Sequence, residues 1–209
     1  MKIVSVLAQK GGVGKTTLTL HWAVEAERQG LGPVAVIDTD TQQSAAAWYR
    51  RREHQTPVVL NPPQGELQDA LQACQNGGIK LVFIDTMPRI EQPSIEAAQI
   101  ANLSIIPCGA SIVDIDAIGA TVSIVEKVAR PGIIVLNQGR PGSGINEKAA
   151  QVVSQYGLPV CPVHIMRRAA LADAFTDGRA VVELEPSGKA AAEITESWHW
   201  IAKQLRRAK

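Results

Sequence analysis

Short runs of apolar, often β-branched residues recur along the chain and are separated by segments of helical character. The apolar runs are nearly continuous, which is typical of strands buried on both faces of a parallel sheet. The strands predicted by this pattern are 2–8, 34–38, 57–60, 80–85, 103–107, 132–138 and 159–165.

The alternation of these strands with helical segments is typical of βαβ units. We therefore predict an α/β fold with three layers, in which helices flank a mostly parallel, twisted sheet. Proline and glycine clusters indicate loops rather than linkers, so residues 1–209 are expected to form a single domain. The predicted helices are 16–29, 42–53, 64–76, 93–101, 114–129, 144–156, 168–177 and 189–206.

Composition changes this picture little. Lysine and arginine total 21 against 20 aspartates and glutamates, so the global charge indicates neither a nucleic-acid nor a membrane partner. Cys74, Cys108 and Cys161 are far apart and suggest neither a zinc site nor a disulfide framework, which favours a cytoplasmic protein. No apolar segment approaches the ~20 residues needed to span a bilayer, and no signal peptide is recognised.

The stretch LAQKGGVGKTT, Leu7–Thr17, joins the first strand to the first helix. It matches the phosphate-loop pattern GxxxxGK[ST], except that Gln9 stands at the first glycine position. Glycines let backbone N–H groups surround phosphate oxygens, and the following helix adds its positive N-terminal end. Lys15 can then reach the β- and γ-phosphates, and the Thr16 hydroxyl can ligate Mg²⁺. The expected nucleotide-binding residues here are Lys10, Gly11, Gly12, Val13, Gly14, Lys15, Thr16 and Thr17.

The segment KGGVGKT, Lys10–Thr16, resembles the KGGxGKT signature of the ParA/MinD group of P-loop ATPases, which has a deviant Walker A motif. The resemblance implies a P-loop NTPase fold, with ATP and Mg²⁺ as cofactors. Weak intrinsic ATP hydrolysis is expected because the sequence shows no strong general base. The resemblance also implies that Lys10 reaches across a homodimer to the phosphates bound by the other subunit. A cation supplied only on dimerisation would make dimerisation depend on ATP.

Acidic residues follow two predicted strands, at the edge where open α/β sheets bind ligands. VIDTDTQQS resembles the family's D-x-D-P-Q-x-S segment, with Thr41 in place of proline, and implies that Asp40 places the attacking water and the Mg²⁺ shell. The D-x-D pattern alone is equally consistent with a helix cap, and Asp38 is either structural or assisting. Asp85 occupies the Walker B position, which holds Mg²⁺. The expected catalytic residues are Lys10, Lys15 and Asp40, and the expected metal ligands are Thr16, Asp40 and Asp85.

The resemblance continues toward the C-terminus. Ser111 and Asp114 match the family's P-x-x-x-S-x-x-D segment and indicate a helix start and a dimer surface. Asn137, at a strand end, is implied to hydrogen-bond the adenine, although a turn-forming asparagine is a serious alternative. RAALADAF and the KAAAEI run also match the family, with Leu171 replacing the usual aromatic residue.

The segment 189–209 carries five basic and two acidic residues, a local patch suited to phosphate backbones. Its apolar residues at helical spacing fit either a helix packed on the domain or, less well, an amphipathic membrane helix. Arg50–Arg52 is a second basic run, which is more often a solvated helix face. The expected DNA-binding residues are Arg168, Lys189, Lys203, Arg206 and Arg207.

Together these features predict a small partitioning ATPase of ParA type. Mg-ATP would drive sandwich dimerisation and nonspecific DNA binding, and hydrolysis stimulated by a partner would release the DNA. The expected partner is a ParB-like centromere-binding protein or a cargo adaptor, and the expected location is the nucleoid, without stable membrane association. The alternatives are a MinD-type membrane-surface positioning ATPase and a P-loop metabolic enzyme, which would need a small-molecule site.

Overall fold

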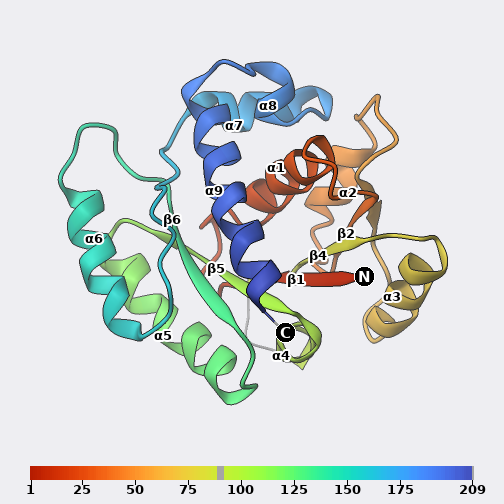
Figure 1. Ribbon diagram of the computed structural model, residues 1–209, viewed down its shortest axis with the longest axis horizontal. Helices are drawn as coiled ribbons and strands as arrows, with labels where there is room; N and C mark the ends of the chain where they lie inside the picture. The colour runs from red at the N-terminus through yellow and green to blue at the C-terminus, as the bar shows by residue number, and fades with distance from the viewer. Residues whose placement is uncertain (89–91, 209) are drawn as a thin grey trace.

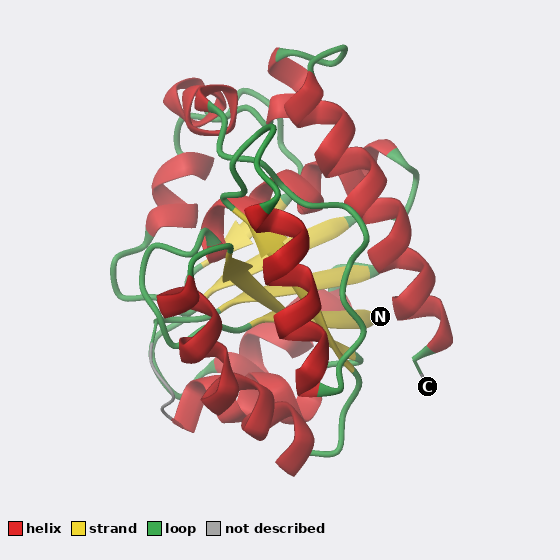
Figure 2. Ribbon diagram, turned by 90° about the vertical axis from the view of Figure 1, so that its left-hand side faces the viewer, coloured by secondary structure: helices red, strands yellow, loops and turns green. Residues whose placement is uncertain are grey.

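The computed structural model describes residues 1–88 and 92–208, and places a six-stranded sheet between two layers of helices (Figures 1 and 2). The strand order is β3-β2-β4-β1-β5-β6, and each neighbouring pair is parallel. The predicted α/β class is therefore confirmed. The strands are β1 (Lys2–Val6), β2 (Val34–Asp38), β3 (Val58–Leu60), β4 (Leu81–Asp85), β5 (Leu103–Gly109) and β6 (Gly132–Asn137).

The helices connect successive strands and then cover the sheet after β6 (Figure 1). They are α1 (Lys15–Arg28), α2 (Ser44–Tyr49), α3 (Leu67–Asn76), α4 (Gln92–Ile100), α5 (Ile112–Lys127), α6 (Ile145–Val153), α7 (Ala169–Asp173), α8 (Val181–Leu184) and α9 (Lys189–Arg207), with short 3₁₀ turns η1 (Ser154–Tyr156) and η2 (Ala174–Asp177).

Alternate residues of the central strands face opposite helical layers, because successive side chains of a strand point to opposite faces. Val34 and Val36 of β2 pack in the core shared with α1, α2 and α9. Ala35 and Ile37 pack against α3 and α4. Both faces are buried, which is why the strands appear in the sequence as unbroken apolar runs.

One predicted strand is wrong. The segment 159–165 is no strand of the sheet, and it pairs with β6 through an isolated bridge between Ile134 and Val160. Pro159 and Pro162 explain the difference, because proline has no N–H to donate to a neighbouring strand. The segment still runs beside β6, where its backbone bonds include Ile165 N–H to the carbonyl of Leu136 at 2.9 Å.

Two predictions about helical segments also need correction. The segment predicted as one helix over 168–177 consists of α7 followed by η2. The helix predicted at 42–53 is shorter in the structure, where it is α2, and Arg52 lies beyond its end. Arg52 is not on a solvated face: its side chain is 3% exposed and forms a bidentate ion pair with Glu183, at 2.8 and 2.9 Å.

Candidate nucleotide site

The loop between β1 and α1 forms a tight turn at the carboxyl edge of the sheet. Gly12 and Gly14 have φ angles of 79° and 90°, a conformation that favours glycine. A Cβ on Gly14 would also lie 2.3 Å from Nδ2 of Asn137. The glycines therefore provide both the left-handed turn and the close approach of the loop to β6.

The end of β6 holds this loop in place. Asn137 donates its side-chain N–H to the carbonyl of Val13 at 2.8 Å, and Gln138 donates to the carbonyl of Gly12 at 2.7 Å. The loop engages one N–H of the Asn137 amide, which leaves the second N–H and the side-chain carbonyl oxygen for a ligand. Gln138, which sequence reasoning missed, is therefore a second residue that shapes the loop.

Lys15 and Asp85 are buried close together behind the loop. Lys15 is 7% exposed, and burial lowers the pKa of its ammonium, an effect opposed by the charges of Asp85 and Asp40. Burial raises the pKa of Asp85 to about 7, while the Thr16 hydroxyl and Lys15 lower it. The structure thus brings together the two residues that the sequence predicted for the γ-phosphate and the metal.

The Asp85 carboxylate fits a metal ligand. It is 0% exposed, and neither of its oxygens has a hydrogen bond of good geometry among the described residues, although the Thr16 hydroxyl and the Lys15 ammonium lie near enough to stabilise part of its charge. A buried, unpaired carboxylate is costly unless a cation or proton compensates it. Within residues 1–88 and 92–208, no cluster of three or more His, Cys, Asp or Glu side chains forms a complete metal cage. This donor set suits Mg²⁺, which is often held by one or two carboxylates and by substrate phosphates.

The two aspartates after β2 have different surroundings. Asp38 is buried and accepts backbone N–H groups from Asp40 at 3.1 Å and from Ala45 at 3.0 Å, so it fixes the loop that leads to α2. Burial raises the pKa of Asp38. Asp40 is half-buried, and among the described residues its carboxylate accepts only the N–H of Gln42. The geometry therefore favours a structural role for Asp38 and leaves Asp40 facing the site.

Lys10 points along the surface toward the start of α5. Its ammonium forms an ion pair with Asp114 at 2.5 Å, and Asp114 also accepts the hydroxyl of Ser111. Ser111 caps α5 by accepting the N–H of Asp114, as the sequence predicted for a helix start. These contacts hold the pKa of the Asp114 carboxyl below its usual range, although its partial burial acts in the opposite direction.

A cavity of about 590 Å³ opens beside the loop, on the side of Asn137. It is large enough for a small ligand. One wall is formed by the phosphate loop and the end of β6, and the other by the segment after residue 165. The lining residues are Gly12, Gly14, Thr17, Asn137, Gln138, Met166, Arg167, Arg168, Ala169, Leu171 and Ala172.

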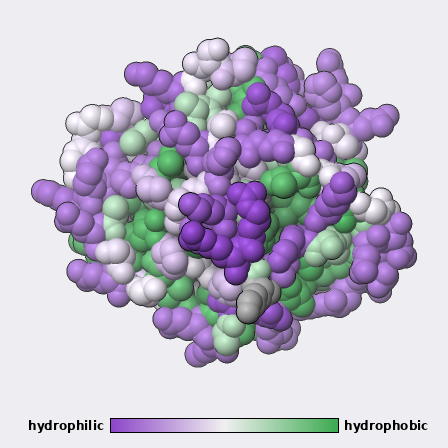
Figure 3. All heavy atoms as spheres, viewed as in Figure 1, coloured by the Kyte–Doolittle hydropathy of each residue, from purple (hydrophilic) through white to green (hydrophobic). Residues whose placement is uncertain are grey.

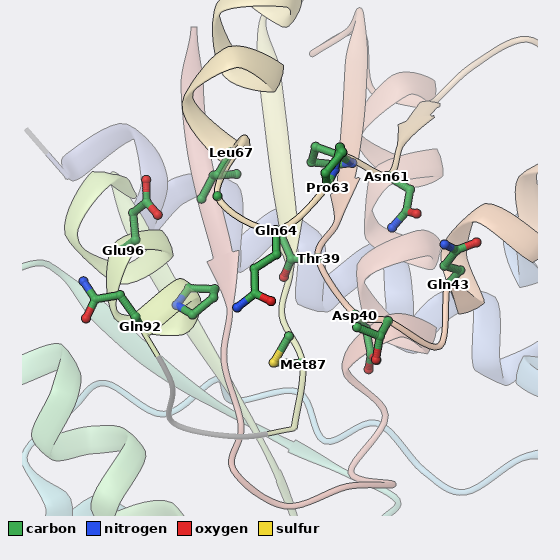
Figure 4. A pocket seen from close by; sticks show the side chains of 14 residues that line it. Thr39, Asp40, Gln43, Asn61, Pro63, Gln64, Leu67, Met87, Gln92 and Glu96 are labelled. Carbon is green, nitrogen blue, oxygen red and sulfur yellow. The ribbon is translucent and has the colours of Figure 1, made fainter.

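A second cavity, of about 510 Å³, lies beside Asp40 at the carboxyl edge of β2, β3 and β4. Figure 4 shows side chains from loops and from the starts of α3 and α4 around it, with Asp40 and Gln43 on one side and Gln92 and Glu96 of α4 on the other. Among the residues that the structure describes, the charged ones that line it are Asp40 and Glu96, and carboxamides such as Asn61 and Gln64 supply most of the remaining polar groups. No motif in the sequence indicated this cavity.

The basic residues predicted for DNA divide into two groups. Lys189, Lys203, Arg206 and Arg207 are exposed on α9. Arg168 is instead on the wall of the 590 Å³ cavity, where its guanidinium is bound by Glu193. Figure 3 shows hydrophilic side chains concentrated at the centre of the face that α9 crosses.

The apolar stripe of α9 is part of the core. Ile194, Trp198 and Ile201 are 0% exposed, and Trp200 packs against the same core while half-buried. The packed-helix interpretation is therefore the one that the structure supports. Among the described residues, no helix has both the length and the apolar character required to cross a membrane.

Comparisons with known proteins agree with this geometry. A model of the CobQ/CobB/MinD/ParA nucleotide binding domain matches residues 4–181. The "maintenance of carboxysome distribution protein A" of Halothiobacillus neapolitanus is 26% identical over 200 residues, covering 91% of each chain. Protein IncC of Escherichia coli is 24% identical over 247 residues, covering 93% of this chain and 67% of IncC.

Solved structures show the same fold. The MinD cell division protein of Aquifex aeolicus superposes with a TM-score of 0.78 at 17% identity, covering 97% of this chain and 98% of that one. Cobyrinic acid a,c-diamide synthase of Mycobacterium smegmatis, with bound ADP and magnesium, gives a TM-score of 0.76 at 17% identity, covering 100% of this chain and 96% of that one.

Proposed function

We propose a function for this chain that starts from its family. The chain belongs to the CobQ/CobB/MinD/ParA nucleotide-binding family. The ParA and MinD members of this family are nucleotide-hydrolysing P-loop ATPases. The chain is a ParA-type positioning ATPase that uses Mg-ATP to form a dimer and to bind DNA without sequence preference. The observation that carries this proposal is the buried, unpartnered Asp85 carboxylate beside Lys15, directly behind the phosphate loop.

The phosphates of ATP bind to the backbone N–H groups of residues 10–17, with Lys15 on the β- and γ-phosphates. Thr16 and Asp85 would hold Mg²⁺, and Asp40 would help to place the water around it. The ion would neutralise charge that develops on the phosphates. The nucleoside occupies the 590 Å³ cavity, with the base near the free carbonyl oxygen of Asn137.

Asp40 orients the attacking water, because it faces the site and has few competing contacts. Asp38 does not take part, since backbone groups occupy both of its oxygens. Intrinsic hydrolysis is slow because the Asp40 carboxylate is a weak base, and a partner protein accelerates it.

Lys10 couples ATP to dimerisation. In the single subunit its ammonium is neutralised by Asp114. In the dimer it exchanges this partner for the phosphates bound by the second subunit, an exchange that is favourable only when ATP is present. Ile112 and Val113, 75% and 63% exposed, lie next to this ion pair and become covered by the second subunit.

DNA binds to the exposed basic residues of α9 and to cations that the fold places beside them. Lys2 donates from its ammonium to the carbonyl of Ala208, and Arg130 and Arg207 line one shallow cavity, so these cations share the amino edge of the sheet. Dimerisation doubles this surface, and binding to phosphates should fall steeply with salt. The cargo is a plasmid, a chromosome or a protein assembly, linked through a ParB-like protein or an adaptor.

The test is DNA binding by the purified chain with ATP, with ADP and without nucleotide, at 50 and 200 mM salt. We expect binding only with ATP, at least a tenfold loss at the higher salt, and no binding by Lys10→Ala. Lys148→Ala, an exposed lysine of α6, is the matched control and should bind as the wild type does. DNA binding that is equal under all nucleotide conditions would refute the switch.

The 510 Å³ cavity beside Asp40 favours a second candidate, a P-loop metabolic enzyme that transfers phosphate to a small molecule. In that case a small amide or carboxylate substrate, rather than DNA with a partner protein, would accelerate ATP turnover. A membrane-surface ATPase is disfavoured because the apolar stripe of α9 is buried. ATP-dependent flotation of the chain with anionic liposomes would instead support a membrane-surface ATPase.

A further inference from the structure

A carboxylate of α9 holds the segment that follows residue 165. Glu193 accepts the backbone N–H of Met166 through Oε2 at 3.0 Å. Its Oε1 accepts two N–H groups from the Arg168 guanidinium, at 3.0 Å from Nε and 2.5 Å from Nη2. Both side chains are mostly buried, with exposed fractions of 16% for Glu193 and 25% for Arg168.

The same segment forms the outer wall of the 590 Å³ cavity beside the phosphate loop. Met166 and Arg168 line that cavity, and each is tied to a different oxygen of Glu193. Glu193 itself does not line the cavity. It therefore acts on any ligand there through the two residues that it holds.

We propose that Glu193 is a positioning residue for nucleoside binding, because its carboxylate fixes the Met166–Arg168 wall against the phosphate loop before the ligand arrives. This inference rests on the proposed function, which places the nucleoside in this cavity. It assigns Arg168 to the nucleotide site and removes it from the DNA surface.

The physical reason is preorganisation. Hydrogen bonds to a charged group are among the stronger ones in proteins, and a side chain that is loose before binding costs affinity when the ligand has to order it. Without the Glu193 carboxylate, the wall has to be ordered by the ligand itself. The phosphate loop, in contrast, is held by Asn137 and Gln138 from β6 and does not depend on Glu193.

The test compares ligands that do and do not reach the wall. ATP, ADP and inorganic tripolyphosphate, each with Mg²⁺, compete against a fluorescent ATP analogue bound to the full chain. The variants are Glu193→Gln, Arg168→Ala and the double variant, and Glu196→Gln is the control because Glu196 is exposed on the same helix. The melting temperature is measured for each variant, and binding is measured well below it.

We expect Glu193→Gln to weaken ATP and ADP about tenfold and to leave tripolyphosphate unchanged. KM for ATP should rise by the same factor with little change in kcat, and at saturating ATP the DNA affinity should match the wild type. The double variant should be no weaker than the worse single variant, because Glu193 and Arg168 act on the ligand through the same wall of the cavity.

Equal weakening of ATP and tripolyphosphate would overturn the inference, because it would show a general loss of structure. Unchanged ATP affinity in both single variants would overturn it as well. Failure of the proposed function gives a different result, in which wild type and Lys15→Ala bind the fluorescent nucleotide equally poorly. If Glu193→Gln does not fold, Arg168→Ala tests the same contact from its more exposed side.

Discussion

The buried imidazole of His21 should make the stability of this protein depend on pH. His21 lies on α1 and is 0% exposed. Its Nδ1 accepts the N–H of Val181 at 3.1 Å, so the proton is on Nε2, which lies 3.1 Å from the carbonyl of Leu171 and donates to it. This neutral tautomer joins the helix after the phosphate loop to α7 and α8.

Burial lowers the pKa of His21 to about 4, although the Leu171 carbonyl and the charge of Glu183 act in the opposite direction. The unfolded chain has a histidine pKa near 6.5, so below that pH the unfolded state binds more protons than the folded state. The stability that neutral His21 contributes is complete above pH 6.5 and is lost as the pH falls toward 4. Between pH 7.5 and 5.0 the loss should be about 2 kcal/mol.

The assay is urea unfolding followed by tryptophan fluorescence, with His21→Gln as the comparison because glutamine does not titrate. Other groups also titrate in this range, including Asp85, so the measured quantity is the difference in unfolding free energy between the two proteins. At pH 7.5 the wild type should be the more stable. At pH 5.0 its advantage should be smaller by about 2 kcal/mol. A difference that stays constant between these pH values would refute the reasoning.

The other predictions concern single contacts. Asp85→Asn should reduce Mg²⁺-dependent ATP hydrolysis at least about 100-fold, and retention of normal activity in a phosphate-release assay would exclude Asp85 as a metal ligand. Arg52→Ala should lower the unfolding free energy by about 3–5 kcal/mol because it leaves a mostly buried carboxylate unpaired, whereas Arg50→Ala should change it by less than about 0.5 kcal/mol in the same denaturation assay. Asp114→Asn should lower the protein concentration needed for ATP-dependent dimerisation in analytical ultracentrifugation, since Lys10 no longer has a competing partner. Gly14→Ala should abolish nucleotide binding by calorimetry, because its Cβ would collide with the Asn137 amide.

The sequence was sufficient where one local motif determines the structure. The phosphate loop is continuous, so its glycines, Lys15 and the following helix could be placed without knowing the fold. Asp85 could be placed because parallel strands bring their carboxyl ends to one edge of the sheet. The α/β class followed from the alternation of strands and helices.

Contacts between distant segments could not be predicted. Arg52 looked like part of a solvated basic run, but its partner Glu183 lies 131 residues away. Arg168 looked like a DNA contact because its partner Glu193 is distant in the sequence, so nothing near Arg168 showed that its charge is neutralised. Basic residues signal a charge, and only the fold shows whether that charge is already neutralised. The strand predicted at 159–165 was wrong for a simpler reason. The prediction followed the apolar residues of the segment and gave too little weight to its two prolines.

The packing of α9 also restricts how ATP can control DNA binding. Trp22 of α1 donates to the hydroxyl of Ser197 at 3.0 Å, and the apolar stripe of α9 is buried in the core that α1 shares. Since α1 begins at the phosphate loop, the loop and the basic helix belong to one packed unit. Releasing α9 to expose a new DNA surface would cost the burial of Trp198 and its neighbours, several kcal/mol. Control by ATP should therefore act through association of two preformed basic surfaces, so DNA affinity should rise with dimer formation and not with nucleotide binding to a single subunit.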